Sequence, residues 1–97
     1  MALFSKGYAQ SLNGNAEEAI DAYDKVVRRY GDSPRPELQV GVAWTLISKG
    51  DIRKKANNSL EARVAYEEVV KRYSKSSSSD VQAVVNVAKE RILQLPT

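Results

Sequence analysis

The sequence contains an internal repeat with an offset of 43 residues, and this repeat constrains the fold more than any local motif does. Residues 15–30 return as residues 58–73 with nine identities. The identical pairs are Asn15/Asn58, Glu18/Glu61, Ala19/Ala62, Ala22/Ala65, Tyr23/Tyr66, Val26/Val69, Val27/Val70, Arg29/Arg72 and Tyr30/Tyr73. The same offset relates residues 3–7 to 46–50 and residues 37–39 to 80–82. Since one offset relates three separate segments, we expect a stack of copies of one structural unit.

Both copies of the longest repeated stretch have the spacing of an amphipathic helix. In the first copy the apolar side chains recur at steps of three and four residues, which places them on one face. They are Ala16, Ala19, Ile20, Tyr23, Val26, Val27 and Tyr30. At the start of each copy an asparagine and a glutamate have the spacing of a capping box, Asn15 with Glu18 and Asn58 with Glu61. We therefore predict helices over Asn15–Tyr30 and Asn58–Tyr73.

Turn-forming residues divide the rest of the chain into three further helical segments. A glycine at position 14 ends the first, a proline at position 36 begins the second, and a serine-rich loop precedes the third. Ser79 and Gln82 have the spacing of a capping box for the last helix. The predicted segments are Met1–Asn13, Pro36–Ala56 and about 80–95. The sequence thus predicts one all-α domain of five helices over residues 1–97.

The residue types that most catalytic and metal sites need are missing. The chain has no cysteine and no histidine, which excludes disulfides, zinc–thiolate sites and histidine catalysis. The adjacent acidic pairs Glu17/Glu18 and Glu67/Glu68 point about 100° apart around a helix, so neither pair can act on one substrate. We therefore expect no enzymatic activity, no metal and no cofactor.

The chain also lacks a segment that would place it in a membrane. No apolar run approaches the roughly 20 residues that a membrane span needs, and no signal peptide is recognisable. These features predict a soluble protein of the cytoplasm with no membrane partner.

Small, aromatic and turn residues recur at matching places in the two copies. They are Leu3 and Leu46, Gly7 and Gly50, the turn Gly14-Asn15, and the pairs Ala19/Tyr23 and Ala62/Tyr66. In these residues the units resemble tetratricopeptide repeats, in which two antiparallel helices form each unit. The departures from that pattern are Lys6 and Lys49 at a usual leucine, and Gln10 and Arg53 at a usual tyrosine. The period of 43 residues also exceeds the typical length of about 34 and falls in the range of HEAT-like helical repeats.

The resemblance implies a right-handed α-solenoid of antiparallel helix hairpins. Its repeats would span about 2–44 and 45–87, followed by a terminal helix over 80–95. In such a solenoid the first helix of each pair lines a concave face, so the implied function is a non-catalytic scaffold that binds a peptide or helix of a partner protein. The residues placed on that face are Phe4, Tyr8, Ser11, Trp44, Ile47, Asp51, Lys54, Lys55, Glu90 and Gln94. For Trp44 and Ile47, packing between neighbouring helices is an equal alternative.

One subset of the family grips the C-terminal carboxylate of a partner with basic and amide side chains. In this chain the corresponding positions hold Phe4, Tyr8, Ser48, Val87 and Arg91. Only Arg91 has suitable chemistry, so the resemblance does not predict that ligand.

Two other functions stay open. The first is self-association through the ends of the stack, because the predicted last helix has apolar side chains on two faces. These are Ala83, Val84, Val85, Val87 and Ala88. The second is nucleic-acid binding through the basic clusters Arg28-Arg29, Arg53–Lys55 and Lys71-Arg72. Nucleic acid is the less favoured of the two, since the net charge of +3 is small and all three clusters lie at helix C-termini, where the helix dipole favours cations anyway.

Overall fold

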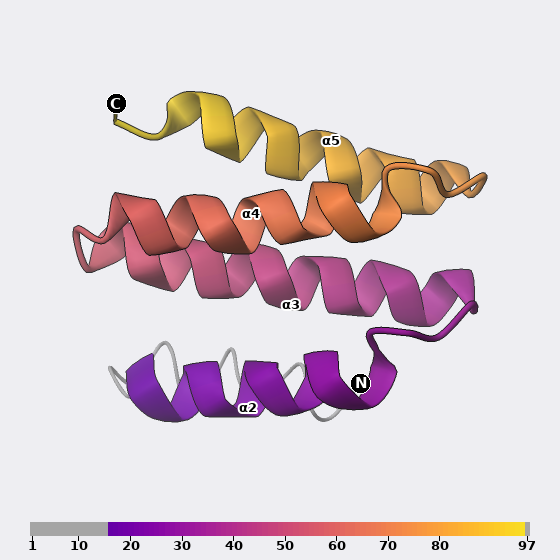
Figure 1. The fold of residues 1–97 in the computed structure, drawn as a ribbon, viewed down its shortest axis with the longest axis horizontal. Coiled ribbons are helices and arrows are strands. Elements are labelled where there is room, and N and C mark those ends of the chain that lie inside the picture. Colours follow the sequence, from indigo (N-terminus) through magenta and orange to yellow (C-terminus); the bar gives the residue numbers. More distant parts are fainter. Residues whose placement is uncertain (1–15, 97) are drawn as a thin grey trace.

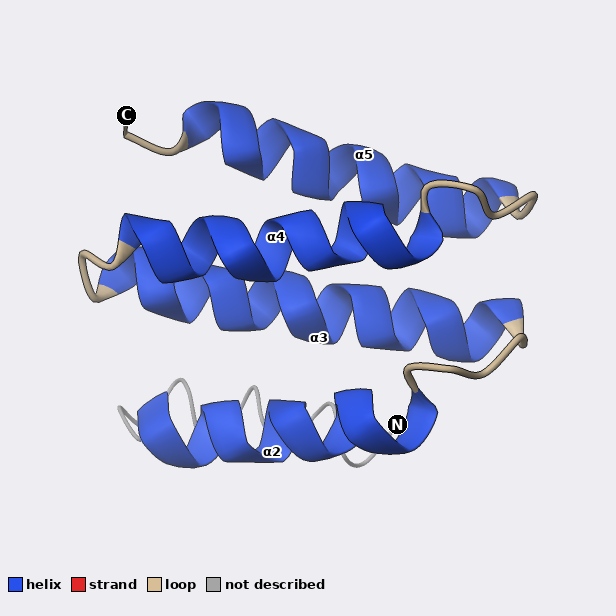
Figure 2. Cartoon of the chain, in the orientation of Figure 1, coloured by secondary structure: helices blue, strands red, loops and turns tan. Residues whose placement is uncertain are grey.

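The computed structural model describes residues 16–96, which form four α-helices joined by short loops (Figure 1 and Figure 2). They are α2 (Ala16–Tyr30), α3 (Pro36–Lys55), α4 (Ser59–Tyr73) and α5 (Ser79–Gln94). Each lies within one residue of its predicted bounds, and residues 16–96 contain no strand, so the all-α prediction is confirmed there. The sequence predicts five helices and the structure describes four, because the helix predicted over Met1–Asn13 lies outside the described residues.

Successive helices run antiparallel and lie side by side (Figure 1). The central helix is α3, which contacts α2, α4 and α5. In Figure 1, α4 lies in front of α3, so the chain alternates between two faces of the stack. This is the arrangement of stacked helix hairpins. None of the helices described between residues 16 and 96 is both long enough and apolar enough to cross a membrane.

The core follows the central helix and draws apolar side chains from every described helix. Val26 of α2 and Val42, Ala43, Leu46 and Ile47 of α3 are buried in it. From α4 and α5 come Ala62, Tyr66, Val69, Tyr73, Val81, Val84, Val85 and Ala88. Thr45, a buried polar residue of α3, donates its hydroxyl to the carbonyl of Gly41 at 2.8 Å. Because α3 packs on both sides, the two repeats share one core and depend on each other for burial.

The structure confirms the predicted cap of α4 and corrects that of α5, whereas Asn15, the predicted cap of α2, lies outside the described residues. Asn58 caps α4, since its Oδ1 accepts a hydrogen bond from the Glu61 amide at 3.2 Å. For α5 the predicted cap Ser79 is wrong, and Ser78 takes that role by accepting from the Val81 amide at 3.3 Å. A cap residue has non-helical backbone angles, as Ser78 does at φ −76° and ψ 126°, whereas Ser79 already lies in the helix.

The loops before α3 and α5 repeat each other in their hydrogen bonds. The side-chain amide of Gln39 donates to the carbonyl of Ser33 at 3.1 Å, and Gln82 donates to the carbonyl of Ser76 at 2.7 Å. In each loop the amide two residues after the serine donates to the serine Oγ, at 3.2 and 3.1 Å. All these positions are related by the offset of 43 residues. The repeat therefore extends beyond the helices to the loops that set their spacing.

The C-terminal end of α4 forms hydrogen bonds with the loop that follows α2. Its last residue, Tyr73, donates its hydroxyl to the carbonyl of Gly31 at 3.2 Å, and Arg72 Nη1 donates to the same oxygen at 3.3 Å. The Arg72 guanidinium also pairs with Glu68 at 2.7 Å and with Asp32 at 3.6 Å. These contacts join the C-terminal end of α4 to the loop after α2, at one end of the stack.

Candidate functional site

Side chains of different chemistry share one face of α3, and we call this row of residues the α3 line. Trp44, Asp51 and Lys55 are separated by seven and four residues, which places them on one face of the helix. Along the helix axis, Asp51 lies about 10 Å and Lys55 about 16 Å from Trp44. The indole of Trp44 is 44% exposed, which is high for the largest side chain of the molecule. This face therefore has an apolar end and a charged end.

The charged end opens into a hollow between the last turns of α3 and α5. Its volume is about 540 Å³. The lining residues are Asp51, Lys54, Lys55, Asn57, Arg91 and Gln94. Asn57 reaches this place because it adopts a left-handed backbone at φ 62°, which ends α3 and turns the chain into α4. The hollow is thus built by α3, the turn that follows it, and α5, which is distant from both in sequence.

Asp51 joins three helices at the floor of this hollow. Its Oδ1 accepts a hydrogen bond from the hydroxyl of Tyr66 in α4 and another from Nε of Arg91 in α5, at 3.1 Å for the arginine. Tyr66 is fully buried. Burial raises the pKa of the Tyr66 hydroxyl well above its ordinary value, and the hydrogen bond to the Asp51 carboxylate raises it further. The carboxylate of Asp51 is therefore engaged in holding the helices together.

The two lysines that line the hollow are exposed and available to a partner. Lys54 and Lys55 are exposed, and neither forms an ion pair with any residue in the described range 16–96. With Arg91 they set three cations against the one carboxylate of Asp51. The C-terminal ends of α3 and α5 contribute about half a negative charge each, which reduces this excess without cancelling it.

The structure brings together four of the ten residues that were predicted to face a partner. Asp51, Lys54, Lys55 and Gln94 line the hollow, and Trp44 lies two helical turns away on the same face of α3. Glu90 is exposed on α5 but does not line the hollow. Phe4, Tyr8 and Ser11 lie outside the described residues.

Ile47 does not face a partner. Its side chain is 1% exposed and belongs to the core, because the neighbours packed around α3 cover this part of the helix. The packing alternative holds for Ile47, whereas Trp44 keeps an open surface.

Two lining residues, Asn57 and Arg91, were missing from the predicted set. Arg91 precedes Gln94 by three residues and therefore shares its helix face, so the helical period alone could have found it. Asn57 had no such signal, because its position depends on how the turn after α3 is shaped.

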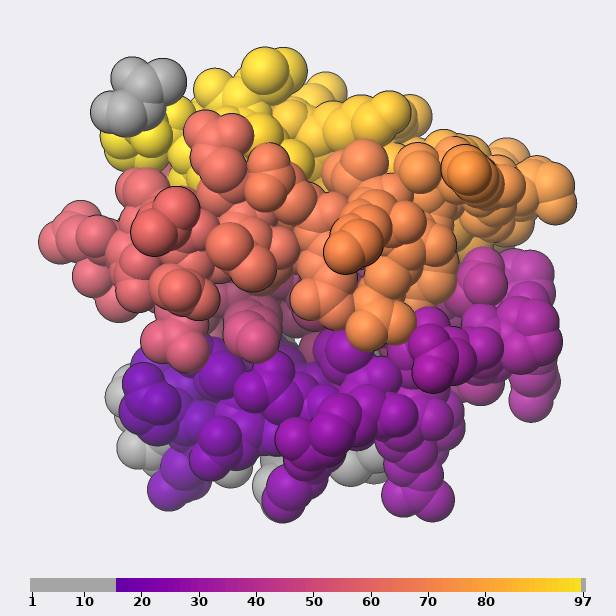
Figure 3. Space-filling view, viewed as in Figure 1, coloured from indigo at the N-terminus to yellow at the C-terminus, as the bar shows by residue number. Residues whose placement is uncertain are grey.

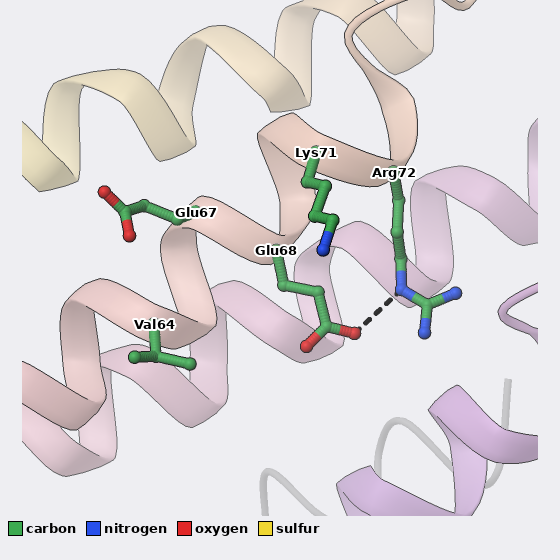
Figure 4. A pocket seen from close by; sticks show the side chains of 5 residues that line it. All are labelled: Val64, Glu67, Glu68, Lys71 and Arg72. Carbon is green, nitrogen blue, oxygen red and sulfur yellow. Dashed lines mark hydrogen bonds and ion pairs between the residues drawn. The ribbon is translucent and has the colours of Figure 1, made fainter.

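A second hollow of about 550 Å³ lies on the outer side of α4, on the face that Figure 3 shows hollowed between α4 and α2. It is lined by Val64, Glu67, Glu68, Lys71 and Arg72 (Figure 4). Glu68 and Arg72 point toward each other and pair at 2.7 Å, and Glu67 pairs with Arg63 at 4.0 Å. Since most of its charges are already satisfied within one helix, this hollow is the weaker candidate.

The three basic clusters do not form one stripe. Because α3 runs antiparallel to α2 and α4, Arg53–Lys55 lies at one end of the stack and the clusters Arg28-Arg29 and Lys71-Arg72 lie at the other (Figure 1). A phosphate backbone needs cations along a continuous track. In residues 16–96 no group of three acidic side chains gathers as metal ligands would.

A family model described as tetratricopeptide repeat matches residues 1–33 and 46–76, which is about two thirds of the chain. The two matched segments contain the first and second copies of the repeated helix. No curated protein and no solved structure matches the chain.

Proposed function

The chain belongs to the tetratricopeptide repeat family, and from this premise we propose that it is a scaffold that binds a segment of a partner protein along the face shared by α3 and α5. Repeats of this family generally mediate contacts between proteins, and the family is typically non-catalytic. In the proposal the first helices of two repeats, about 2–44 and 45–87, and the terminal helix line a concave face of a right-handed solenoid.

The observation that carries the proposal is the hollow at the ends of α3 and α5 together with exposed Trp44. A binding face needs an aromatic anchor that is open to a partner and polar groups that fix the partner's orientation. The α3 line supplies the indole, and the hollow supplies two lysines, an arginine and two side-chain amides. All of these groups except the amide of Asn57 stand on helices, so their backbone positions are set before a partner arrives.

The proposal can be tested by selecting binders from a library of random displayed peptides. We expect the selected peptides to change the fluorescence of Trp44, which is the only tryptophan of the chain. We expect Trp44→Ala to lower the affinity for these peptides by about tenfold or more, as the loss of an aromatic anchor does. The matched control is Val64→Ala in the outer hollow, which should leave affinity unchanged. Binders that respond to Val64→Ala and not to Trp44→Ala, or a library without binders, would overturn the proposal.

Self-association through the end of the stack has less support. Val84, Val85 and Ala88 are buried within the molecule and are not free for a second copy. The offset of 43 maps the buried α3 residues Ala43, Leu46 and Ile47 onto Asn86, Lys89 and Glu90 of α5, which are polar and exposed. One large apolar side chain, Leu93, is 85% exposed there. A single leucine among polar residues is ordinary surface and does not form an interface.

A further inference from the structure

The charges and spacing of the α3–α5 face indicate what kind of partner segment suits it. The hollow holds Lys54, Lys55 and Arg91 against one carboxylate, and that carboxylate already accepts hydrogen bonds from Tyr66 and Arg91. A partner with basic side chains would meet two unpaired lysines and be repelled. Carboxylates of a partner would find lysines that have no ion partner among residues 16–96.

The position of Trp44 adds a second requirement. Along the axis of α3, Trp44 lies about 10 Å from Asp51 and about 16 Å from Lys55, the first and last α3 residues that line the hollow. An extended peptide advances about 3.3 Å per residue, so this span corresponds to about three to five residues. A segment lying along α3 would therefore place an apolar side chain on Trp44 and its acidic side chains three to five positions away.

We propose, on the basis of the scaffold function proposed above, that this face binds an extended acidic segment of a partner protein. The segment has one apolar anchor for Trp44 and, three to five residues along, at least two aspartate or glutamate side chains for the hollow. Lys54 and Lys55 contact these carboxylates, with Arg91 held at the floor by Asp51. The side-chain amides of Asn57 and Gln94 offer further donors at the rim.

A single-stranded nucleic acid is the other anionic polymer that could use an exposed indole and lysines. The face shared by α3 and α5 is a poor match for a nucleic acid, because only one end of the α3 line is basic and the hollow contains a carboxylate. A nucleic acid carries charge at every residue and would meet no cation near Trp44 on the α3 line, where the intervening residue is Ser48. Charge confined to one end is suited to a peptide whose acidic residues are clustered.

The test begins with the peptides selected in the library experiment. We expect them to share an apolar residue followed or preceded, three to five positions away, by clustered Asp or Glu. The strongest binder is then compared with its twin in which every Glu and Asp is replaced by Gln and Asn. We expect the twin to bind at least about tenfold more weakly, with the difference shrinking in about 0.5 M salt, because these contacts are exposed to screening.

Charge reversal on the protein supplies the second arm. The double variant Lys54→Glu, Lys55→Glu should bind the acidic peptide at least about tenfold more weakly. The matched control, Lys25→Glu with Lys71→Glu, changes the net charge equally at exposed positions on α2 and α4 and should change affinity by less than about twofold. Circular dichroism checks that both variants are folded.

The outcomes separate the two proposals. Selected peptides that depend on Trp44 but bind as well when their acidic residues are neutralised would overturn the acidic-segment inference and leave the scaffold function standing. Equal weakening by the two charge reversals would also overturn it, because the effect would then come from overall charge. Tighter binding of a single-stranded oligonucleotide than of any selected peptide would replace the inference with nucleic-acid recognition. A library without binders would overturn both proposals.

Discussion

The ring of Tyr66 packs directly on the backbone of Gly50. A Cβ atom at position 50 would come within 2.7 Å of Cδ1 and 2.8 Å of Cζ of that ring. Tyr66 is fully buried, so the ring has no free space to move into. The glycine therefore permits α3 and α4 to approach closely, and it recurs at position 7 in the first copy of the repeat.

Gly50→Ala should destabilise the protein although alanine is the better helix former. The added methyl group overpacks the core, which costs about 1–3 kcal/mol, whereas the gain in helix propensity is at most about 1 kcal/mol. Urea unfolding followed by circular dichroism measures the difference. In a Tyr66→Leu background the same change should become neutral or stabilising, because the ring is gone. A more stable Gly50→Ala protein with Tyr66 present would contradict the packing argument.

Tyr66→Phe should lower the free energy of unfolding by about 1–2 kcal/mol. The change removes a hydrogen bond to a charged acceptor, Asp51, while the carboxylate keeps Arg91 and its access to water. Tyr30→Phe is the matched control, because it removes the same atom from a half-buried ring. We expect it to change the free energy of unfolding by no more than about 0.5 kcal/mol. Equal losses in both variants would show that the bond to Asp51 contributes nothing.

Stability should fall as the pH rises above about 10, the ordinary pKa of tyrosine. Burial raises the pKa of the hydroxyls of Tyr66 and Tyr73 in the folded protein. A raised pKa means that the folded state holds its proton more tightly, so the stabilisation is complete below pH 10 and is lost progressively as the pH rises through the folded-state values. A Tyr66→Phe, Tyr73→Phe protein, unfolded in urea at several pH values, should lose less stability over this range. The same slope in both proteins would refute the prediction.

The helices could be predicted from sequence because two independent signals agree, the 3.6-residue period and the offset of 43. The cap of α5 was placed one residue late, because four consecutive serines at 76–79 offer equivalent hydroxyls and only the backbone angles distinguish them. Four of the six residues that line the hollow were also in the set that the repeat alignment gave, namely Asp51, Lys54, Lys55 and Gln94. The prediction that Ile47 faces a partner was wrong. An alignment shows which face of a helix a residue occupies, but not how much of that face the neighbouring helices cover.

Gln82→Ala should cost more stability than Gln39→Ala, although the two residues are repeat equivalents. The amide nitrogen of Gln82 lies within 3.3 Å of three carbonyl oxygens, those of Tyr73, Ser74 and Ser76. Gln39 donates to one carbonyl, that of Ser33. At about 1 kcal/mol for each hydrogen bond, and with two N–H groups on the amide, we expect about 2 and 1 kcal/mol in urea unfolding. A larger loss for Gln39→Ala would show that the loop before α5 contributes less than its hydrogen bonds indicate.

Asp51→Asn should separate the two effects of this carboxylate, which stabilises the helix packing and opposes the binding of acidic peptides. The amide keeps an acceptor for Tyr66 but loses the ion pair with Arg91, so stability should fall by about 1 kcal/mol. Among the described residues that line the hollow, Asp51 carries the only carboxylate. Its removal should therefore let an acidic peptide bind about two- to fivefold more tightly, the range of one screened ion contact.

The control for this variant is Asp24→Asn. Asp24 pairs with Lys49 at 2.8 Å outside the hollow, so the substitution makes an equal change of net charge and also breaks one ion pair. Urea unfolding and peptide titration are measured on both variants at low salt. We expect both to lose stability and only Asp51→Asn to gain affinity, because the field of a single charge is screened within about 10 Å. A gain of equal size in Asp24→Asn would mean that acidic peptides respond to net charge and not to the hollow between α3 and α5.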